Sequence, residues 1–353
     1  MSLAVTAPTS HIVDPDPHAL TRRARPSTPA FDWTVTALCA VFLGGLFFDG
    51  WAHTHGRVDE TFFTPWHAAL YSGFLATAVF LWASFVWGVR RGYPWRAALP
   101  DGYGLSLLGV ALWLVGGPFD AGWHAVFGFE ANVEALMSPA HLVLALGFAL
   151  MVSGPLRAIL RNPSRGWSRE LPLVLSLTFS VSLLTFFTQI AHPLSNLWAS
   201  GIRPGSATAT ELGLVSFCLT SAIVLGPVLL LLRHGRLPAG AMTILIGVNS
   251  IAMGFLYDHG LYPLAAVVAL IVAGAATDLL RLALRPGPGR VTAFRAYATA
   301  VPVILTGFYF ACLGLTHGIG WSPHLWLGVV AFCGVVGWLL SYLMLPPRLE
   351  AAA

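Results

Sequence analysis

The sequence has little charge of either sign and no lysine, which excludes an ordinary soluble domain. Only 10% of the 353 residues are charged, 56% are hydrophobic, and all nineteen basic residues are arginine. The mean hydropathy is +0.74, whereas a soluble domain carries about a quarter charged residues. The hydrophobic residues stand in runs of about twenty, the length that spans the ~30 Å hydrocarbon core of a bilayer. The composition therefore predicts a protein embedded in a lipid bilayer.

Cysteine is scarce, and motifs that bind nucleotides are absent. The four cysteines, Cys39, Cys218, Cys312 and Cys333, all lie in hydrophobic runs and form no Cys-x2-Cys pair. This pattern argues against a disulfide framework and against a thiolate zinc site. The sequence has no Walker loop, no dinucleotide glycine fingerprint and no nucleophile elbow. We therefore expect no nucleotide partner, and the placement of the arginines, described below, argues against nucleic acid.

The hydrophobic runs predict an all-α, polytopic membrane protein with about ten transmembrane helices. Residues 1–30 are polar and contain five prolines, so we expect a disordered cytoplasmic tail there, with a second tail at 347–353. The first tail lacks the basic start and small-residue cleavage site of a secretory signal. The helices are expected at 32–53, 64–89, 103–126, 138–160, 171–192, 208–232, 239–257, 262–284, 295–316 and 323–345.

The arginines set the orientation of these helices. Seventeen of the nineteen lie in the two tails or near the loops that follow the even-numbered helices, and only Arg57 and Arg203 lie in the other loops. Because positive charge stays on the cytoplasmic side, both termini are expected there, in the cell (inner) membrane. Nine of the twelve histidines then fall at the extracytoplasmic ends: His53, His55, His67, His124, His141, His192, His259, His317 and His324.

An internal repeat relates residues 46–75 to residues 117–149. Three pairs of residues correspond: Asp49 with Asp120, His53 with His124, and His67 with His141. Weaker similarities to this pattern recur later in the chain. Five helix hairpins of the same arrangement would account for ten helices. Repeats of this kind are a common way of building membrane proteins.

Each of the first two hairpins carries the same pair of motifs. An Asp-x3-His stands at the outer end of the odd helix, and its four-residue spacing places both side chains on one helix face. Thr64-Pro65 and Ser138-Pro139 begin the even helices, as an N-cap followed by a proline at the first helical position. The histidine two residues after each proline therefore points back toward the Asp-x3-His motif.

Two histidines and one carboxylate form a ligand set for a transition metal. The set predicts metal sites at Asp49, His53 and His67 and at Asp120, His124 and His141. Such sites suit copper, iron or zinc and leave coordination positions open. Copper is expected ahead of zinc and iron because it binds most tightly among these divalent ions. A bound cation would also balance a carboxylate that is costly within a membrane.

Further polar residues lie beside these motifs at the outer ends of the helices. They could bind the same ions, support the ligands, or recruit metal at the rim. For the acidic residues of the outer loops, ordinary solvated charge is the alternative interpretation. The set comprises His55, Asp59, Glu60, Glu130, Glu134, His317 and His324.

Asp49-x3-His53 followed by Phe63-Thr64-Pro65-Trp66-His67 resembles the metal-binding segment of the C subunit of the copper membrane monooxygenases, the particulate methane and ammonia monooxygenases. In that subunit an Asp-x3-His at a helix end and a histidine opening the next helix bind copper. A second Asn/His/His set lies one hairpin later. Asp120, His124 and His141 fall where that second set would, with aspartate in place of asparagine.

The resemblance covers about residues 31–160, which hold the metal motifs, and leaves the further hairpins of residues 161–346 unmatched. The chain has more helices than that subunit and lacks the soluble copper domain of the B subunit. The resemblance implies a copper site in the membrane. It also implies, as a further expectation, a copper-dependent monooxygenase or a subunit of one, with redox chemistry on the outer side. Partner membrane subunits or a homo-oligomer would then be expected.

Two other functions remain open on the sequence. The outer histidines and carboxylates could collect a transition metal ion or a proton for transport, although the inner halves of the helices offer few polar residues to continue such a path. Alternatively, facing histidines could hold a haem near the outer surface, as in a membrane cytochrome.

Overall fold

The computed structural model describes residues 25–57, 64–128, 133–162, 164–202, 205–257 and 262–347. These residues form helices and no strand. Nine helical segments among them are long and apolar enough to cross a membrane. The nine segments are α1 (Pro29–Thr54), α2 (Pro65–Arg90), α3 (Gly104–Phe127), α5 (Pro139–Val152) with α6 (Gly154–Arg161), α7 (Trp167–Phe187), α9 (Ala207–Arg233), α11 (Tyr262–Leu284), α12 (Val291–Thr316) and α13 (Pro323–Met344).

The remaining described helices are shorter. At the predicted helix 239–257 the chain forms α10 (Ala241–Phe255), which has 15 residues and is apolar but shorter than a full span. Four short helical elements lie between the longer helices: η2 (Trp95–Ala97), α4 (Val133–Met137), η3 (Gln189–Ala191) and α8 (Pro193–Asn196). The prediction of an all-helical chain is confirmed for the described residues, and their nine long apolar segments support the predicted multi-pass membrane protein.

The predicted helix 171–192 was wrong at both ends, because α7 runs from Trp167 to Phe187. Gly166, with φ of 123°, stands at its N-cap position, where glycine is well tolerated. At the other end, Pro193 opens α8 and disfavours helical backbone at the residue before it. The chain leaves the helix at Thr188 and forms the single turn η3 before Pro193.

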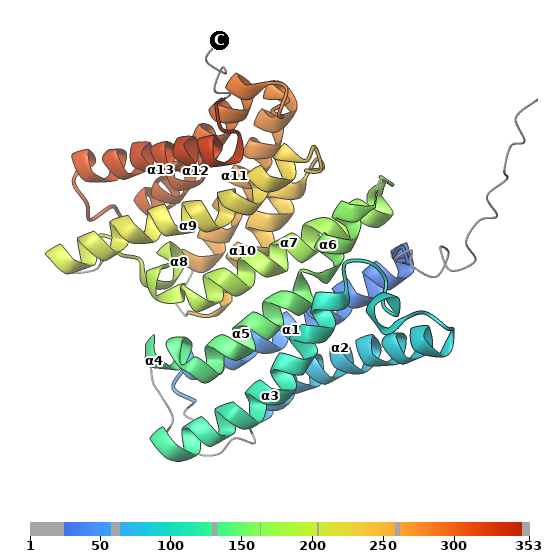
Figure 1. Ribbon diagram of the computed structural model, residues 1–353. Coiled ribbons are helices and arrows are strands. Elements are labelled where there is room, and N and C mark those ends of the chain that lie inside the picture. Colours follow the sequence, from blue (N-terminus) through green and yellow to red (C-terminus); the bar gives the residue numbers. More distant parts are fainter. Residues whose placement is uncertain are drawn as a thin grey trace, which may run out of the picture.

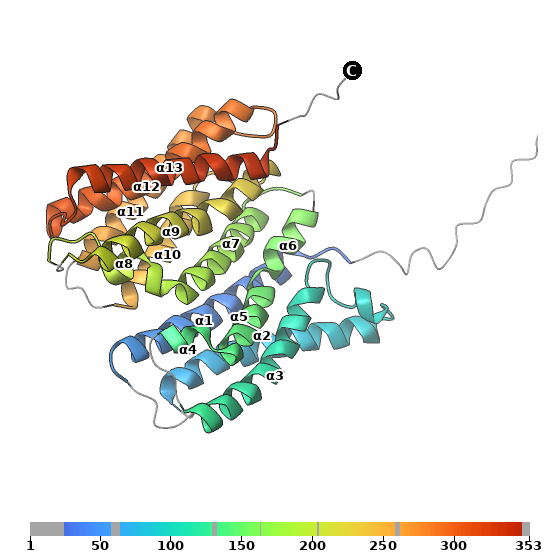
Figure 2. The same ribbon diagram turned by 60° about the vertical axis from the view of Figure 1, so that its left-hand side comes forward.

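Two groups of helices are visible in Figures 1 and 2. The chain from α1 to α5 forms one group, and α9 to α13 form the other. The long helix α7 lies between them, since it packs against α1, α5 and α6 on one side and against α9 and α10 on the other. Within the first group α1 pairs with α2, and α3 pairs with α5. The two metal motifs therefore belong to two neighbouring hairpins of one group.

The outward faces of the helices are apolar, as lipid contact requires. On α2, the large side chains of Leu75, Val79 and Trp82 follow one another at helical spacing and are 59%, 58% and 57% exposed. Contiguous apolar surface of this kind is rare on soluble monomers. It fits a helix whose outer face contacts hydrocarbon.

Glycines bring the paired helices into close contact. A Cβ on Gly45 would lie 2.7 Å from Cα of Leu70, so α1 and α2 touch at backbone level. A Cβ on Gly116 would lie 2.8 Å from Leu144, at the corresponding contact between α3 and α5. Small residues at such crossings are typical of membrane helix packing. The close approach brings the end of α1 beside the start of α2, and the end of α3 beside the start of α5.

A buried polar cluster ties the opposite ends of these helices together. The Asp32 carboxylate near the start of α1 is fully buried and accepts hydrogen bonds from the Tyr103 hydroxyl at 2.7 Å and the Ser27 hydroxyl at 3.0 Å. Arg169 of α7 completes the cluster with an ion pair to Asp32 at 3.1 Å. The cluster connects α1, α3 and α7 at the end of the bundle away from the metal motifs.

Candidate metal centres

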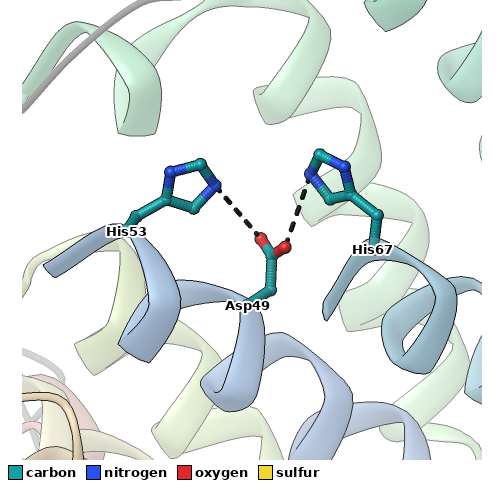
Figure 3. Close-up of side chains that lie close together, drawn as sticks. All are labelled: Asp49, His53 and His67. Carbon is teal, nitrogen blue, oxygen red and sulfur yellow. Dashed lines mark ion pairs between the residues drawn. The ribbon is translucent and has the colours of Figure 1, made fainter. Parts of the chain in front are cut away.

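The first centre lies where α1 ends and α2 begins. Asp49 and His53 come from the last two turns of α1, and His67 comes from the first turn of α2 (Figure 3). The Thr64 hydroxyl accepts a hydrogen bond from the backbone N–H of His67 at 3.2 Å. This N-cap starts the helix at Pro65 and fixes the backbone of the histidine.

The three side chains of this centre converge. Nε2 of His67 lies 3.4 Å from Oδ1 of Asp49, and Nε2 of His53 lies 3.9 Å from Oδ2. Figure 3 shows the carboxylate between the two imidazoles. The side chains of Asp49 and His67 are 14% and 17% exposed, whereas that of His53 is 46% exposed. The centre is therefore covered on the helix side and open beside His53.

The second centre repeats this arrangement between α3 and α5. Oδ1 of Asp120 lies 3.5 Å from Nε2 of His124 and 3.2 Å from Nε2 of His141. The Ser138 hydroxyl accepts a hydrogen bond from the backbone N–H of His141 at 3.3 Å. Here the carboxylate is 7% exposed, and His124 and His141 are 12% and 27% exposed. Asp120 is thus more deeply buried than Asp49, and His124 is more deeply buried than His53.

The spacing of the donor atoms fits a shared metal ion. In each centre one donor atom from each of the three residues lies within 4.8 Å of the other two. Two donors that bind one ion at about 2.0–2.2 Å stand roughly 3.4 Å apart at tetrahedral angles. Oδ1 of Asp120 is buried and accepts no hydrogen bond from the residues that the structure describes. An ion would satisfy that oxygen and both imidazoles at once.

Two of the other residues predicted near the ions, His55 and Glu134, are described and belong to neither group of ligands. His55 is exposed, its Nδ1 lies 2.9 Å from the carbonyl oxygen of Trp51, and its ring packs on the Trp51 indole. Glu134 is exposed on the short helix α4. Asp59, Glu60 and Glu130 lie outside the described residues.

The later histidines belong to the other group of helices. His317 follows α12, and its ring packs 5.0 Å from that of Tyr262. His324 is exposed on the first turn of α13. Among the described residues, the two Asp/His/His centres are the only groups of three metal-binding side chains. The prediction that His317 and His324 add ligands is therefore unsupported by their positions.

Sequence reasoning did not single out Tyr71, which packs between α2 and α3 against Gly117 and Trp113. Tyr71 follows His67 by one turn of α2, and its ring and hydroxyl lie 3.6 Å from the position of a Cβ on Gly117 of α3. Gly117 precedes Asp120 by three residues on the same helix. No motif in the sequence marks Tyr71, because its contact with Gly117 depends on how α2 packs against α3.

Together, the fold and the two centres define a multi-pass, all-helical membrane protein with two candidate metal sites at neighbouring hairpins. No protein family, no curated protein and no solved structure matches the chain in comparisons of its sequence and fold. What the protein does must therefore be argued from the two centres.

Proposed function

We propose that this chain is a membrane copper-binding protein related to the C subunit of the copper membrane monooxygenases. One observation supports the proposal above all others. The same three donors, a carboxylate and two imidazoles, converge twice in neighbouring hairpins. A single Asp/His contact is common in proteins without a metal, but two matching triads on the same scaffold argue for a shared chemical purpose.

The donor set favours copper. Imidazole nitrogen suits copper, zinc, iron and nickel, and copper binds most tightly among the divalent ions. The described cysteines lie outside both triads, so each candidate site offers nitrogen and oxygen donors only. Three protein ligands leave at least one position for a small molecule. The proposed centres are therefore open sites suited to chemistry.

The resemblance to the C subunit extends the proposal to redox chemistry. Copper held in this way could exchange an electron and bind dioxygen, which is the chemistry that the resemblance implies. The protein's own contribution would be to hold two imidazoles and one carboxylate in place and to balance the charge of the ion. The apolar faces of α2 and α3 would bring a substrate dissolved in the bilayer close to the centres.

The proposal also includes an extracytoplasmic position for both triads and a duplication of one hairpin. The concentration of arginine at the opposite helix ends supports an extracytoplasmic position for both triads. Matching contacts support a duplication of one hairpin, since Gly73 approaches Phe42 as Gly147 approaches Trp113, one repeat later. The position of the carboxylate between two imidazoles favours an ion over a haem, which would have to occupy the same space.

Copper analysis of the purified protein tests the proposal. The wild type, reconstituted with Cu²⁺ and freed of excess metal, should hold two ions per chain. Asp49→Ala and Asp120→Ala should each hold one ion, and the double variant should hold none. His55→Ala is the matched control, because it removes an outer histidine two residues from His53 that lies outside the triad. Copper-free wild type, or full stoichiometry in the double variant, would defeat the proposal.

A further inference from the structure

The first half of α12 and the last turns of α13 form a groove. It has a volume of about 500 Å³ and is lined by residues of α12 between Thr292 and Val303, and by Trp338 and Tyr342 of α13. The two helices lie side by side in the second group, which holds neither triad (Figures 1 and 2). The groove opens on the outside of the molecule, since Trp338 is 43% exposed. Its occupant would therefore come from the surroundings of the helices.

One end of the groove is polar and carries aromatic rings. The Arg295 guanidinium lies over the Tyr342 ring, at 3.7 Å from its centroid. The rings of Tyr342 and Trp338 pack edge-on, with 4.9 Å between their centroids. Tryptophan, tyrosine and arginine are side chains that gather where a membrane meets water. This end of the groove is therefore suited to the depth of lipid headgroups.

The other end of the groove is apolar. Ala300 and Val303 line it, five and eight residues beyond Arg295 on α12. At a rise of 1.5 Å per residue, Val303 lies about 12 Å along the helix axis from Arg295. Thr299 stands between them, but its hydroxyl donates to the carbonyl oxygen of Arg295 at 2.9 Å. The lining thus changes from cationic to apolar in the direction in which a lipid passes from headgroup to acyl chain.

The guanidinium of Arg295 lacks acceptors for its donors. It offers five N–H groups, and its buried Nε donates to no residue that the structure describes. Arginine pairs with described carboxylates at Arg161 and Arg169 instead, and the described residues that line the groove include no acid. A phosphate diester would supply the missing acceptors, since two of its oxygens match the fork of a guanidinium.

We propose that this groove binds one phospholipid with an anionic headgroup, with its phosphate on Arg295 and an acyl chain along Ala300 and Val303. The occupant is a lipid rather than free phosphate, because inorganic phosphate would leave the apolar end unfilled. An anionic lipid fits better than a zwitterionic one, since no described carboxylate lines the groove to pair with a headgroup ammonium. The proposal goes beyond the copper sites and does not depend on them.

Lipid titrations of the purified full chain in detergent test the polar end. Phosphatidylglycerol and phosphatidylcholine with identical acyl chains are added, and native mass spectrometry counts the bound lipids. One arginine near an anionic headgroup changes a dissociation constant about fivefold. The wild type should therefore bind the first phosphatidylglycerol more tightly than phosphatidylcholine by about this factor.

Variants of Arg295 should change this preference. Arg295→Gln should remove it, whereas Arg295→Lys, which keeps the positive charge, should retain most of it. Arg90→Gln is the matched control, because Arg90 is exposed at the end of α2, outside the groove. This control should bind both lipids as the wild type does.

A second pair of variants tests the apolar end. Ala300→Phe fills the groove with a ring and leaves Arg295 in place. It should weaken the binding of both lipids about fivefold or more, because the acyl chain loses buried methylenes. Ala283→Phe places the same ring on an exposed position of α11, outside the groove, and should leave lipid binding unchanged. Inorganic phosphate should not displace phosphatidylglycerol from the wild type.

Equal affinity of the wild type for both lipids, or a preference that survives in Arg295→Gln, would overturn the proposal. Displacement of phosphatidylglycerol by inorganic phosphate, or unchanged lipid affinity in Ala300→Phe, would do the same. Thermal melting shows which variants remain folded, and if Arg295→Gln does not, Arg295→Lys and Ala300→Phe decide the question. Copper stoichiometry should stay at the wild-type value in every variant, so failure of the lipid site and failure of the copper sites are measured separately.

Discussion

Nε2 of His141, on the first turn of α5, lies 3.2 Å from Oδ1 of Asp120, near the end of α3. The two residues come from two helices that pack together, and their contact matches that of His67 with Asp49, at 3.4 Å, one hairpin earlier. The proposed metal sites depend on these two His–Asp contacts, and the variants below test them.

Replacing Asp120 by asparagine should weaken the second site without disturbing the fold. Asparagine keeps the shape of the side chain but removes the negative charge that would balance a cation. We expect the affinity of that site for Cu²⁺ to fall at least tenfold, as measured by chelator competition. The same change at Asp101, an exposed residue paired with Arg161, should leave copper affinity unaltered.

The N-caps of α2 and α5 should matter for both stability and metal binding. Thr64→Ala and Ser138→Ala remove the acceptors of the backbone N–H groups of His67 and His141. Each change should cost about 1 kcal/mol of unfolding free energy and weaken copper binding at its own site. Ser206 provides the control, since it caps α9 in the same way, far along the chain from the triads. Ser206→Ala should lower the melting temperature similarly and leave copper binding intact, and a loss of copper there would contradict the account.

The buried cluster at Asp32 should contribute to stability alone. Asp32→Ala leaves Arg169, whose side chain is 12% exposed, without its ion-pair partner. Breaking a buried pair from one side costs about 3–5 kcal/mol, so a large drop in melting temperature is expected. Asp101→Ala, which breaks an exposed pair, should cost less than about 1 kcal/mol. Copper stoichiometry in either folded variant should stay at the wild-type value.

His192 predicts a pH dependence of stability. The residue lies between α7 and α9, it is buried, and that burial lowers the pKa of His192 to about 3. Its ordinary pKa is about 6.5, so between these values the unfolded chain takes up a proton that the folded chain does not. Stability should therefore be fully retained above pH ~6.5 and decline progressively as the pH falls from there toward 3, by up to about 1.4 kcal/mol per pH unit.

Melting curves in detergent at a series of pH values measure this effect. His192→Gln should flatten the decline, because the side chain no longer takes up a proton. His234→Gln changes an exposed histidine after α9 and should leave the slope as it is. An unchanged slope in His192→Gln would show that other groups cause the decline.

Much of the fold and of the candidate site can be read from the sequence, because the information is local. Runs of apolar residues mark the long helices, and the arrangement of Thr64-Pro65 and Ser138-Pro139 marks where two of them begin. The triads were predicted because their ligands lie at the two ends of one short loop. Helix geometry then dictates that they face each other.

Features that depend on packing between distant segments were not predicted. The contact of Tyr71 with Gly117 arises only from the way α2 lies against α3, and no spacing within either helix encodes it. The hydrogen bond from Tyr103 to Asp32 likewise joins residues 71 positions apart. The break between α5 and α6 at Ser153 was missed as well, although Pro155, which has no N–H to donate, marks it.

X-ray absorption at the copper edge tests the central claim most directly. The measurement is made on Cu²⁺-loaded Asp120→Ala, which keeps only the first triad, and on Asp49→Ala, which keeps only the second. The account predicts one copper per chain in each variant, with nitrogen and oxygen ligands, two of them imidazoles, and no sulfur. Sulfur ligands, or copper with no imidazole ligand in either variant, would contradict it.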